Sequence, residues 1–261
     1  MAASWLAVGL LAIGFLAVLA IGEALAKRAG VPPDLTRKLD HAAAGPLALA
    51  VPFVLDSPWL VMAFAGSFVA FLVVSRLVGR LRSVHGIARR SVGAYLYPVA
   101  IAATWFATQG HLDRYAVAIL ALSLADAAGG LSGERWGRRI YVAGGQVKTL
   151  EGSLATLAVT GAVSIPVLLA TGVAPIDACL AGGFVAVVVA LVEGSLPFGF
   201  DNLGVPLAAV LALASLGSPL GAAVLLLGAL ALFGIALAVP ASAPAIRRRS
   251  ERIEIAPGPE W

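Results

Sequence analysis

The charged segment Lys148-Thr-Leu-Glu-Gly152 leads directly into Ser153-Leu-Ala-Thr-Leu-Ala-Val-Thr-Gly-Ala-Val-Ser-Ile-Pro-Val-Leu-Leu-Ala-Thr171. This run has about the roughly 20 residues that a helix needs to cross a bilayer. Only helices and closed barrels satisfy every backbone group in lipid, and a continuous apolar run without alternation favours a helix. The stretch therefore predicts a membrane helix with a polar, glycine-containing segment at one end.

The rest of the chain has the same character. Of its 261 residues, 60% are hydrophobic and only 12% are charged, whereas soluble domains carry about 25% charged residues. We therefore predict an all-α polytopic membrane protein with about nine transmembrane helices. The apolar runs cover residues 5–26, 42–55, 59–78, 91–108, 115–131, 153–171, 176–192, 203–216 and 220–239. The runs 42–55 and 203–216 are short, so these helices must extend, thin the bilayer or pack inside the bundle.

The expected organisation is one membrane catalytic domain, residues 1–242, followed by a basic tail, residues 243–261, that we expect to be disordered. The first, third and fifth connections and the tail are rich in Lys and Arg, the even-numbered ones are nearly bare, and the seventh connection, residues 193–202, falls on the basic side by parity although it contains no Lys or Arg. By the positive-inside rule this alternation puts the N-terminus outside and the C-terminus in the cytoplasm. The composition, rich in Ala, Gly and Leu, favours a prokaryotic cell membrane. The sequence indicates no oligomeric state.

The polar motifs then gather at the cytoplasmic ends of several helices, which is typical of an enzyme that uses a cytosolic nucleotide. A transporter also mixes Gly, Pro and carboxylates, but its charges lie near the membrane midplane and its halves repeat. Nucleic-acid binding is not expected, because the net charge of +4 comes from loops at a membrane face and we find no binding module.

Asp126 lies near the cytoplasmic end of the fifth run and precedes Gly129, Gly130 and Gly133. Carboxylates in membrane segments are rare and usually functional, and Mg²⁺ prefers carboxylate oxygens together with substrate phosphates. The glycines would let a ligand approach the backbone. The alternative is an Asp that pairs with a nearby Arg or reaches toward the interface.

Lys148 and Thr149 stand just before the sixth helix. A phosphate at a helix N-terminus meets free N–H donors and a favourable dipole, and Lys148 would add a point charge. The alternative is that Thr149 is only the N-cap of a helix whose first turn runs from Leu150 to Gly152.

Two further segments carry polar side chains to the same face. Arg37, Lys38 and His41 precede the second run, where their simplest interpretation is a basic membrane anchor. Glu193 ends the seventh run, and Asp201-Asn202 opens a Gly- and Pro-rich return into the membrane. Asp201 or Asn202 could merely cap the eighth helix.

Taken together these motifs resemble the polyprenol kinase family, which includes dolichol kinases, phytol kinases and related CTP-dependent lipid kinases. The resemblance covers about residues 37–210. It is carried by Arg37-Lys38 with His41, Arg90-Ser-Val-Gly93 with Tyr97-Pro98, Asp126 with Gly133, Lys148-Thr-Leu-Glu-Gly-Ser153, Glu193, and Asp201-Asn-Leu-Gly-Val-Pro206.

The Lys-Thr-x-Glu-Gly motif is shared with the phosphatidate cytidylyltransferases, which make CDP-diacylglycerol. Their Gly-Gly…Asp-Arg…Asp signature near the end does not occur in this chain, so the kinase is favoured and the cytidylyltransferase is the alternative.

The resemblance implies transfer of the γ-phosphoryl group of CTP, with Mg²⁺, to the hydroxyl of an isoprenoid alcohol such as phytol, geranylgeraniol or dolichol. The implied catalytic residues are Asp126, Lys148, Glu151 and Asp201. The implied metal ligands are Asp126, Glu151, Glu193 and Asp201. The implied nucleotide- or phosphate-binding residues are Arg37, Lys38, His41, Lys148, Thr149, Gly152, Ser153 and Asn202, and the Arg89-Arg90 pair could assist them.

Overall fold

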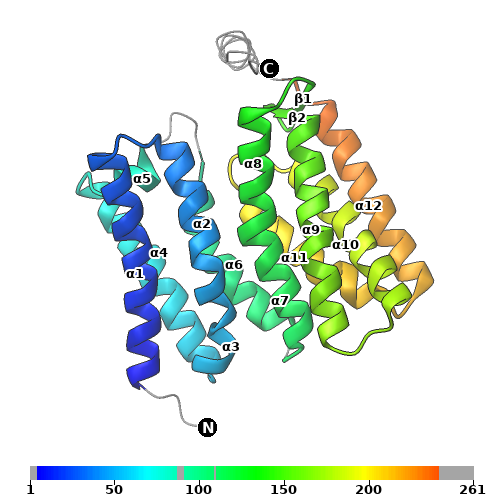
Figure 1. The fold of residues 1–261 in the computed structure, drawn as a ribbon, viewed down its shortest axis with the longest axis horizontal. Helices are drawn as coiled ribbons and strands as arrows, with labels where there is room; N and C mark the ends of the chain where they lie inside the picture. Colours follow the sequence, from blue (N-terminus) through cyan, green and yellow to red (C-terminus); the bar gives the residue numbers. More distant parts are fainter. Residues whose placement is uncertain (1–4, 87–90, 109, 241–261) are drawn as a thin grey trace, which may run out of the picture.

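The computed structural model describes residues 5–86, 91–108 and 110–240, which form a helical bundle with one small hairpin (Figure 1). In chain order the elements are α1 (Trp5–Arg28), α2 (Pro33–Leu49), α3 (Val51–Val54), α4 (Pro58–Leu77), α5 (Arg82–His85), α6 (Gly93–Thr108), α7 (Leu112–Leu120), the π-helix η1 (Ala121–Ala125), α8 (Asp126–Arg135), β1 (Ile140–Ala143), β2 (Gln146–Thr149), α9 (Leu150–Ala170), α10 (Pro175–Ser195), α11 (Asp201–Ser215) and α12 (Pro219–Leu237). The expected tail and the Arg89-Arg90 pair lie outside the described residues.

Six of the described helices are long and apolar enough to cross a membrane: α1, α4, the continuous rod α7-η1-α8, α9, α10 and α12. The other three expected spans are helical but shorter, with 17 residues in α2, 16 in α6 and 15 in α11. The predicted helical membrane architecture therefore holds, while the number of nine crossings and the orientation stay predictions.

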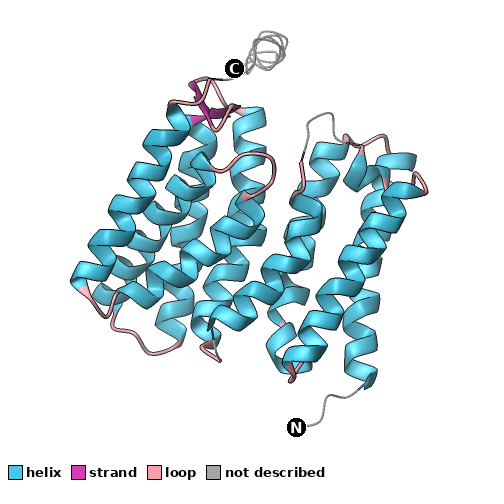
Figure 2. Ribbon diagram, turned by 180° about the vertical axis from the view of Figure 1, so that it is seen from behind, coloured by secondary structure: helices cyan, strands magenta, loops and turns pink. Residues whose placement is uncertain are grey.

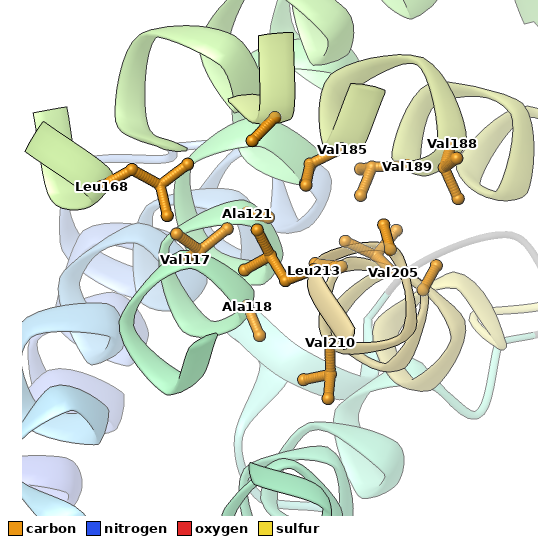
Figure 3. Close-up of a cluster of buried hydrophobic side chains, with 14 of the residues drawn as sticks. Val117, Ala118, Ala121, Leu168, Val185, Val188, Val189, Val205, Val210 and Leu213 are labelled. Atoms are coloured by element: carbon orange, nitrogen blue, oxygen red, sulfur yellow. The ribbon is translucent and has the colours of Figure 1, made fainter. Parts of the chain in front are cut away.

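Two hydrophobic cores divide the bundle. One joins α1, α2, α3, α4 and α6 with residues of α7 and η1, and it includes Phe15, Val51 and Leu55. The other joins α7, α9, α10, α11 and α12, and Figure 3 shows its valine- and alanine-rich centre around Val117, Val185 and Val205. The seam between these cores lies where α2 meets η1 and α8, and where α6 meets α11.

Helix α2 begins earlier than the apolar run predicted. It starts at Pro33 and already contains Arg37, Lys38 and His41, which are only 5–6% exposed. The interpretation of these residues as an exposed membrane anchor is therefore wrong. Proline at the first helical position fits a helix start, because its missing N–H is not needed there. A hydrophobicity scan misses the start of this helix because its first two turns carry charges that the bundle buries.

The hairpin β1–β2 is a second departure from the all-α expectation. Its strands pair antiparallel with Tyr141 opposite Lys148, and Gly144 and Gly145 form the turn. Both glycines have positive φ, 56° and 73°, which a two-residue type I′ turn requires. The N–H of Gly144 donates to the carbonyl of Ala236, 2.8 Å away, so the turn is tied to the end of α12.

Helices α8 and α9 approach closely through glycines. A Cβ added at Gly129 would lie 2.1 Å from Oγ1 of Thr156, and one added at Gly133 would lie 2.7 Å from Oγ1 of Thr149. These glycines therefore serve helix packing. The expectation that they open the backbone to a ligand is wrong for Gly129 and Gly133.

We predict that Gly129→Ala lowers the stability of the folded protein by about 1–3 kcal/mol, since overpacking of a tight contact costs that much. The matched control is Gly228→Ala on α12, where an added Cβ meets nothing within 4 Å and helix propensity favours Ala. Thermal unfolding in detergent measures both variants. Equal melting temperatures for the two would contradict the packing role.

Candidate active site at the seam

Three carboxylates from three elements meet at the seam. Asp126 opens α8, Glu193 lies near the end of α10, and Asp201 opens α11. One oxygen of each lies within 4.8 Å of the others, and each side chain is partly buried. We call Asp126, Glu193 and Asp201 the acidic cluster. Its all-oxygen donor set suits a hard cation such as Mg²⁺.

Asp126 is placed by an irregularity in its own helix. The chain runs as α-helix to Leu120, widens into the π-helix η1 over Ala121–Ala125, and returns to α-helix at Asp126. Such π-bulges are rare and frequently occur at functional sites. Oδ2 of Asp126 lies 3.8 Å from Nδ1 of His41 on α2, which links the acidic cluster to the other half of the bundle.

The loop between α10 and α11, drawn in pink near the centre of Figure 2, returns the chain into the bundle, and Asp201 is the first residue of α11 after it. Phe198 and Gly199 both have positive φ, 57° and 90°, so the turn before α11 is sharply bent. The carbonyl of Phe198 accepts the N–H of Val92 at 2.8 Å. A Cβ at Gly199 would lie 2.4 Å from the nitrogen of Gly93. The turn is therefore held against the start of α6, and only glycine fits at residue 199.

Lys148 on β2 reaches the acidic cluster. Its Nζ lies 2.7 Å from Oε1 of Glu193 and also donates to the Glu193 carbonyl. Burial opposes the charge of the ammonium group, but the nearby carboxylates of Glu193 and Asp201 outweigh it and raise the pKa of Lys148 above its ordinary value. Lys148 is thus a fixed positive charge at neutral pH, as a phosphate contact requires.

Helix α2 contributes two more positively charged side chains. Lys38 forms an ion pair with Glu134, with 2.5 Å between Nζ and Oε1. Its aliphatic stem crosses Gly130, where an added Cβ would lie 2.6 Å from Cε of Lys38. Gly130 therefore makes room for Lys38, while Arg37 lies one residue earlier in the same buried turn of α2.

Two of the backbone donors that we expected to be free at the N-terminus of α9 are engaged. The hydroxyl of Thr149 accepts the N–H of Gly152 at 3.2 Å, and the N–H of Leu150 donates to the carbonyl of Arg139. The N-cap interpretation of Thr149 is therefore confirmed, and the Gly152 amide is already engaged. The Ser153 hydroxyl pairs with that of Tyr141 at 2.6 Å.

Glu151 does not join the acidic cluster. Its two carboxylate oxygens accept the N–H of Arg139 at 3.1 and 3.2 Å, so it fastens the hairpin to the first turn of α9. The geometry corrects the expectation that Glu151 is a metal ligand and catalytic residue, because its carboxylate is bound to backbone away from Asp126, Glu193 and Asp201.

Asn202 sits beside the acidic cluster with its side chain 1% exposed. Neither its Oδ1 nor its Nδ2 makes a hydrogen bond within the described residues, and Nδ2 would lie 2.3 Å from a Cβ at Gly93. Buried polar atoms without partners point to a missing ligand or water. Its backbone N–H donates to Oδ1 of Asp201, which fixes the start of α11.

Two buried residues near His41 received no role from the sequence. Asp40 is 7% exposed, and its Oδ2 has no hydrogen-bond partner within the described residues. Tyr97 donates to the carbonyl of His41 at 3.1 Å and pairs with the Ser123 hydroxyl at 3.0 Å. The sequence did show that Asp40 is a charged residue beside His41 and that Tyr97 belongs to a recognised motif. Neither signal revealed that these two side chains are buried.

We expect Asp126→Asn, Glu193→Gln and Asp201→Asn each to weaken binding of Mn²⁺, a paramagnetic substitute for Mg²⁺, by at least about tenfold. The matched control is Glu151→Gln, which should leave the affinity unchanged because Glu151 holds backbone. Electron paramagnetic resonance of the purified protein measures free and bound Mn²⁺. A loss with Glu151→Gln equal to that of the other variants would contradict the assignment of the acidic cluster.

Comparisons with known proteins give one close relation. The chain is 33% identical over 210 residues to a phytol kinase of Synechocystis sp., and the alignment covers 79% of this chain and 90% of the relative. No family model matches the chain. No solved structure matches it significantly. The chain therefore belongs to the polyprenol kinase family, whose phytol kinase is a phosphotransferase with an alcohol acceptor.

Proposed function

We propose that this protein transfers the γ-phosphoryl group of CTP to the hydroxyl of an isoprenoid alcohol, such as phytol, geranylgeraniol or a dolichol-like polyprenol, at the cytoplasmic face of a membrane. The observation that carries the proposal is the meeting of the acidic cluster with Lys148 at the seam. Phosphoryl transfer depends mainly on positioning and on neutralising phosphate charge, and this arrangement offers both signs of charge at one place.

The acidic cluster would hold Mg²⁺. When bound there, Mg²⁺ neutralises and orients the phosphate oxygens of the nucleotide. Lys148 is tied to Glu193 at 2.7 Å, so its charge lies next to the ion-binding oxygens, where it would contact phosphate. The unpartnered amide of Asn202 adds a donor and an acceptor at the edge of the same site.

His41 is the proposed proton acceptor. Its Nδ1 faces Asp126 at 3.8 Å, so Asp126 orients the ring and leaves Nε2 to receive the proton of the acceptor hydroxyl. The hydroxyl oxygen bonds to the γ-phosphorus, the bond from that phosphorus to the β,γ-bridging oxygen breaks, and CDP leaves. Tyr97 holds the ring in place through a tilted ring contact with 4.5 Å between the ring centroids.

The distribution of basic side chains supports a cytoplasmic site. The hairpin lies at the end of the bundle opposite the start of α1 (Figure 1). Arg28 ends α1, and Arg135, Arg138 and Arg139 lie around the start of the hairpin. Basic residues gather on the cytoplasmic side of membrane proteins, which supports access for a cytosolic nucleotide from the hairpin end.

The test uses purified protein in detergent with Mg²⁺, phytol or geranylgeraniol, and CTP labelled at either the α- or the γ-phosphorus. We expect the γ-label to enter the lipid while the α-label stays in CDP. Labelled CMP in the lipid, with release of pyrophosphate, would instead establish a cytidylyltransferase. Transfer of neither label across a broad panel of lipids would refute the proposal.

Lys148→Ala and Asp126→Asn should each lower the rate of γ-label transfer by at least about a hundredfold, because each removes a charge that neutralises or organises phosphate. Glu151→Gln is the matched control and should retain most activity if the variant folds. Retained activity in Lys148→Ala or Asp126→Asn would remove that residue from the site.

A further inference from the structure

We propose that a cavity enclosed by α1, α2, α4 and α6 receives the hydrocarbon chain of the acceptor alcohol, and that Arg37 and Asp40 bind its hydroxyl group at one end. This inference rests on the proposed kinase function and specifies how the lipid reaches the reacting centre.

The cavity has a volume of about 80 Å³, below the range of about 300–1,000 Å³ typical of preformed small-molecule sites, so its lining side chains must move apart when a chain enters. Its walls are mostly apolar and include Phe15 of α1 and Phe64 and Phe68 of α4. The charged and imidazole groups in its lining are Arg37, Asp40 and His41, all from one turn of α2. Such a cavity, apolar along its length and polar at one end, matches a long-chain alcohol.

The length of the cavity also suits such a ligand. Arg37 and Val51 both line it, and at 1.5 Å per helical residue they are separated by about 20 Å, enough for an extended diterpenoid chain. Val51, Leu55 and Val61 lie at the end far from the polar residues and are only 1–2% exposed, so they close that end.

The polar end contains two atoms that lack partners. Nε of Arg37 and Oδ2 of Asp40 are buried and make no hydrogen bond within the described residues, and the two residues are only 5% and 7% exposed. A hydroxyl group donates one hydrogen bond and accepts others. It therefore satisfies both atoms at once, by donating to Asp40 and accepting from Arg37.

His41 connects this end to the reaction. It lines the cavity, and its Nδ1 lies 3.8 Å from Oδ2 of Asp126 in the acidic cluster. A hydroxyl group bound by Asp40 and Arg37 thus lies beside the imidazole, with the acidic cluster beyond it. Rotation about its C–O bond turns the hydrogen from Asp40 to His41, which then receives the proton. Arg37 is then also placed to contact the phosphate of the product.

The wall between α1 and α4 borders the membrane. The ring of Phe15 meets those of Phe64 and Phe68 edge-on, with centroids 6.0 and 5.5 Å apart, while the outer faces of both helices expose apolar side chains such as Leu16 and Met62. An alcohol dissolved in the lipid therefore reaches the cavity by displacing aromatic rings, without passing through water.

The test fills the cavity and compares acceptors of different length. Ala65→Phe places a ring inside the cavity nearer its closed end, and Ala63→Phe places the same ring on the exposed outer face of α4. We expect Ala65→Phe to lower kcat/KM for phytol and geranylgeraniol by at least about tenfold, since pocket shape discriminates on this scale. The short alcohol geraniol should react within about twofold of the wild-type rate. Ala63→Phe should change neither.

A second variant and a binding measurement keep the proposal testable if Ala65→Phe does not fold. Ala102→Phe fills the cavity from α6, with the same expected loss for long acceptors. A photoreactive diazirine analogue of phytol, used without nucleotide, should label peptides of α2, α4 or α6 that line the cavity, and excess phytol should suppress this labelling.

The outcomes separate the two proposals. The cavity assignment would be overturned if the cavity variants and Ala63→Phe phosphorylated phytol equally well and the probe attached elsewhere. The kinase proposal would still stand in that case. Phytol-suppressible labelling of the cavity in a protein that transfers no phosphoryl group would support the cavity and refute the kinase.

Discussion

The mutual repulsion of Asp126, Glu193 and Asp201 is the constraint around which the rest of the structure is arranged. Two unit charges 4 Å apart repel by about 4 kcal/mol at an effective dielectric constant near 20, and here three carboxylates offer oxygens within 4.8 Å of one another. Such a cluster persists only where positive charge is supplied. Lys148 supplies part of it, and a bound cation would supply the remainder.

Several local features serve to deliver these groups to one point. The hairpin places Lys148 next to the end of α10. Its turn is held against α12 by the hydrogen bond that the Gly144 N–H donates. Glu151 fastens the other side of the hairpin to α9. The turn at Phe198 and Gly199 starts α11 inside the bundle, so Asp201 lies at the depth of Asp126. Each of these features restricts the backbone at the seam. Together they form a site that contains both positive and negative charge.

Much of this architecture followed from the sequence, because long apolar runs and one-sided polar motifs are strong signals in a membrane protein. The meeting of Asp126, Lys148 and Asp201 was expected from their motifs, and Thr149 caps α9 as its side chain allows. The hairpin was missed although Gly144-Gly145 between strand-forming residues is a known turn signal. The start of α2 was missed because a scan for apolar runs cannot find a helix whose charges are buried by its neighbours.

Other features could not be read from the sequence at all. The π-helix before Asp126 depends on how η1 packs against α2, where Gly45 meets Ser123 so closely that an added Cβ would lie 2.7 Å from it. Glu151 belongs to a motif that suggests catalysis. Only the position of Arg139 in the structure shows that the Glu151 carboxylate instead accepts a hydrogen bond from the backbone. The burial of Asp40 likewise depends on Gly22 of α1, where a Cβ would lie 2.2 Å from its carboxylate.

The two cores explain why the site lies where it does. A kinase acting on a membrane alcohol must bring a highly charged nucleotide and an apolar chain together while keeping their surroundings apart. In this bundle the apolar cavity belongs to the core of α1, α2, α4 and α6, whereas the acidic cluster is built by α8, α10 and α11 in the other half. His41, which lines the cavity, and Asp126 of the acidic cluster lie 3.8 Å apart where the two halves meet. Placing the reaction at this seam lets each half retain the dielectric environment that its ligand needs, and it confines the burial of charge to the few side chains that join them.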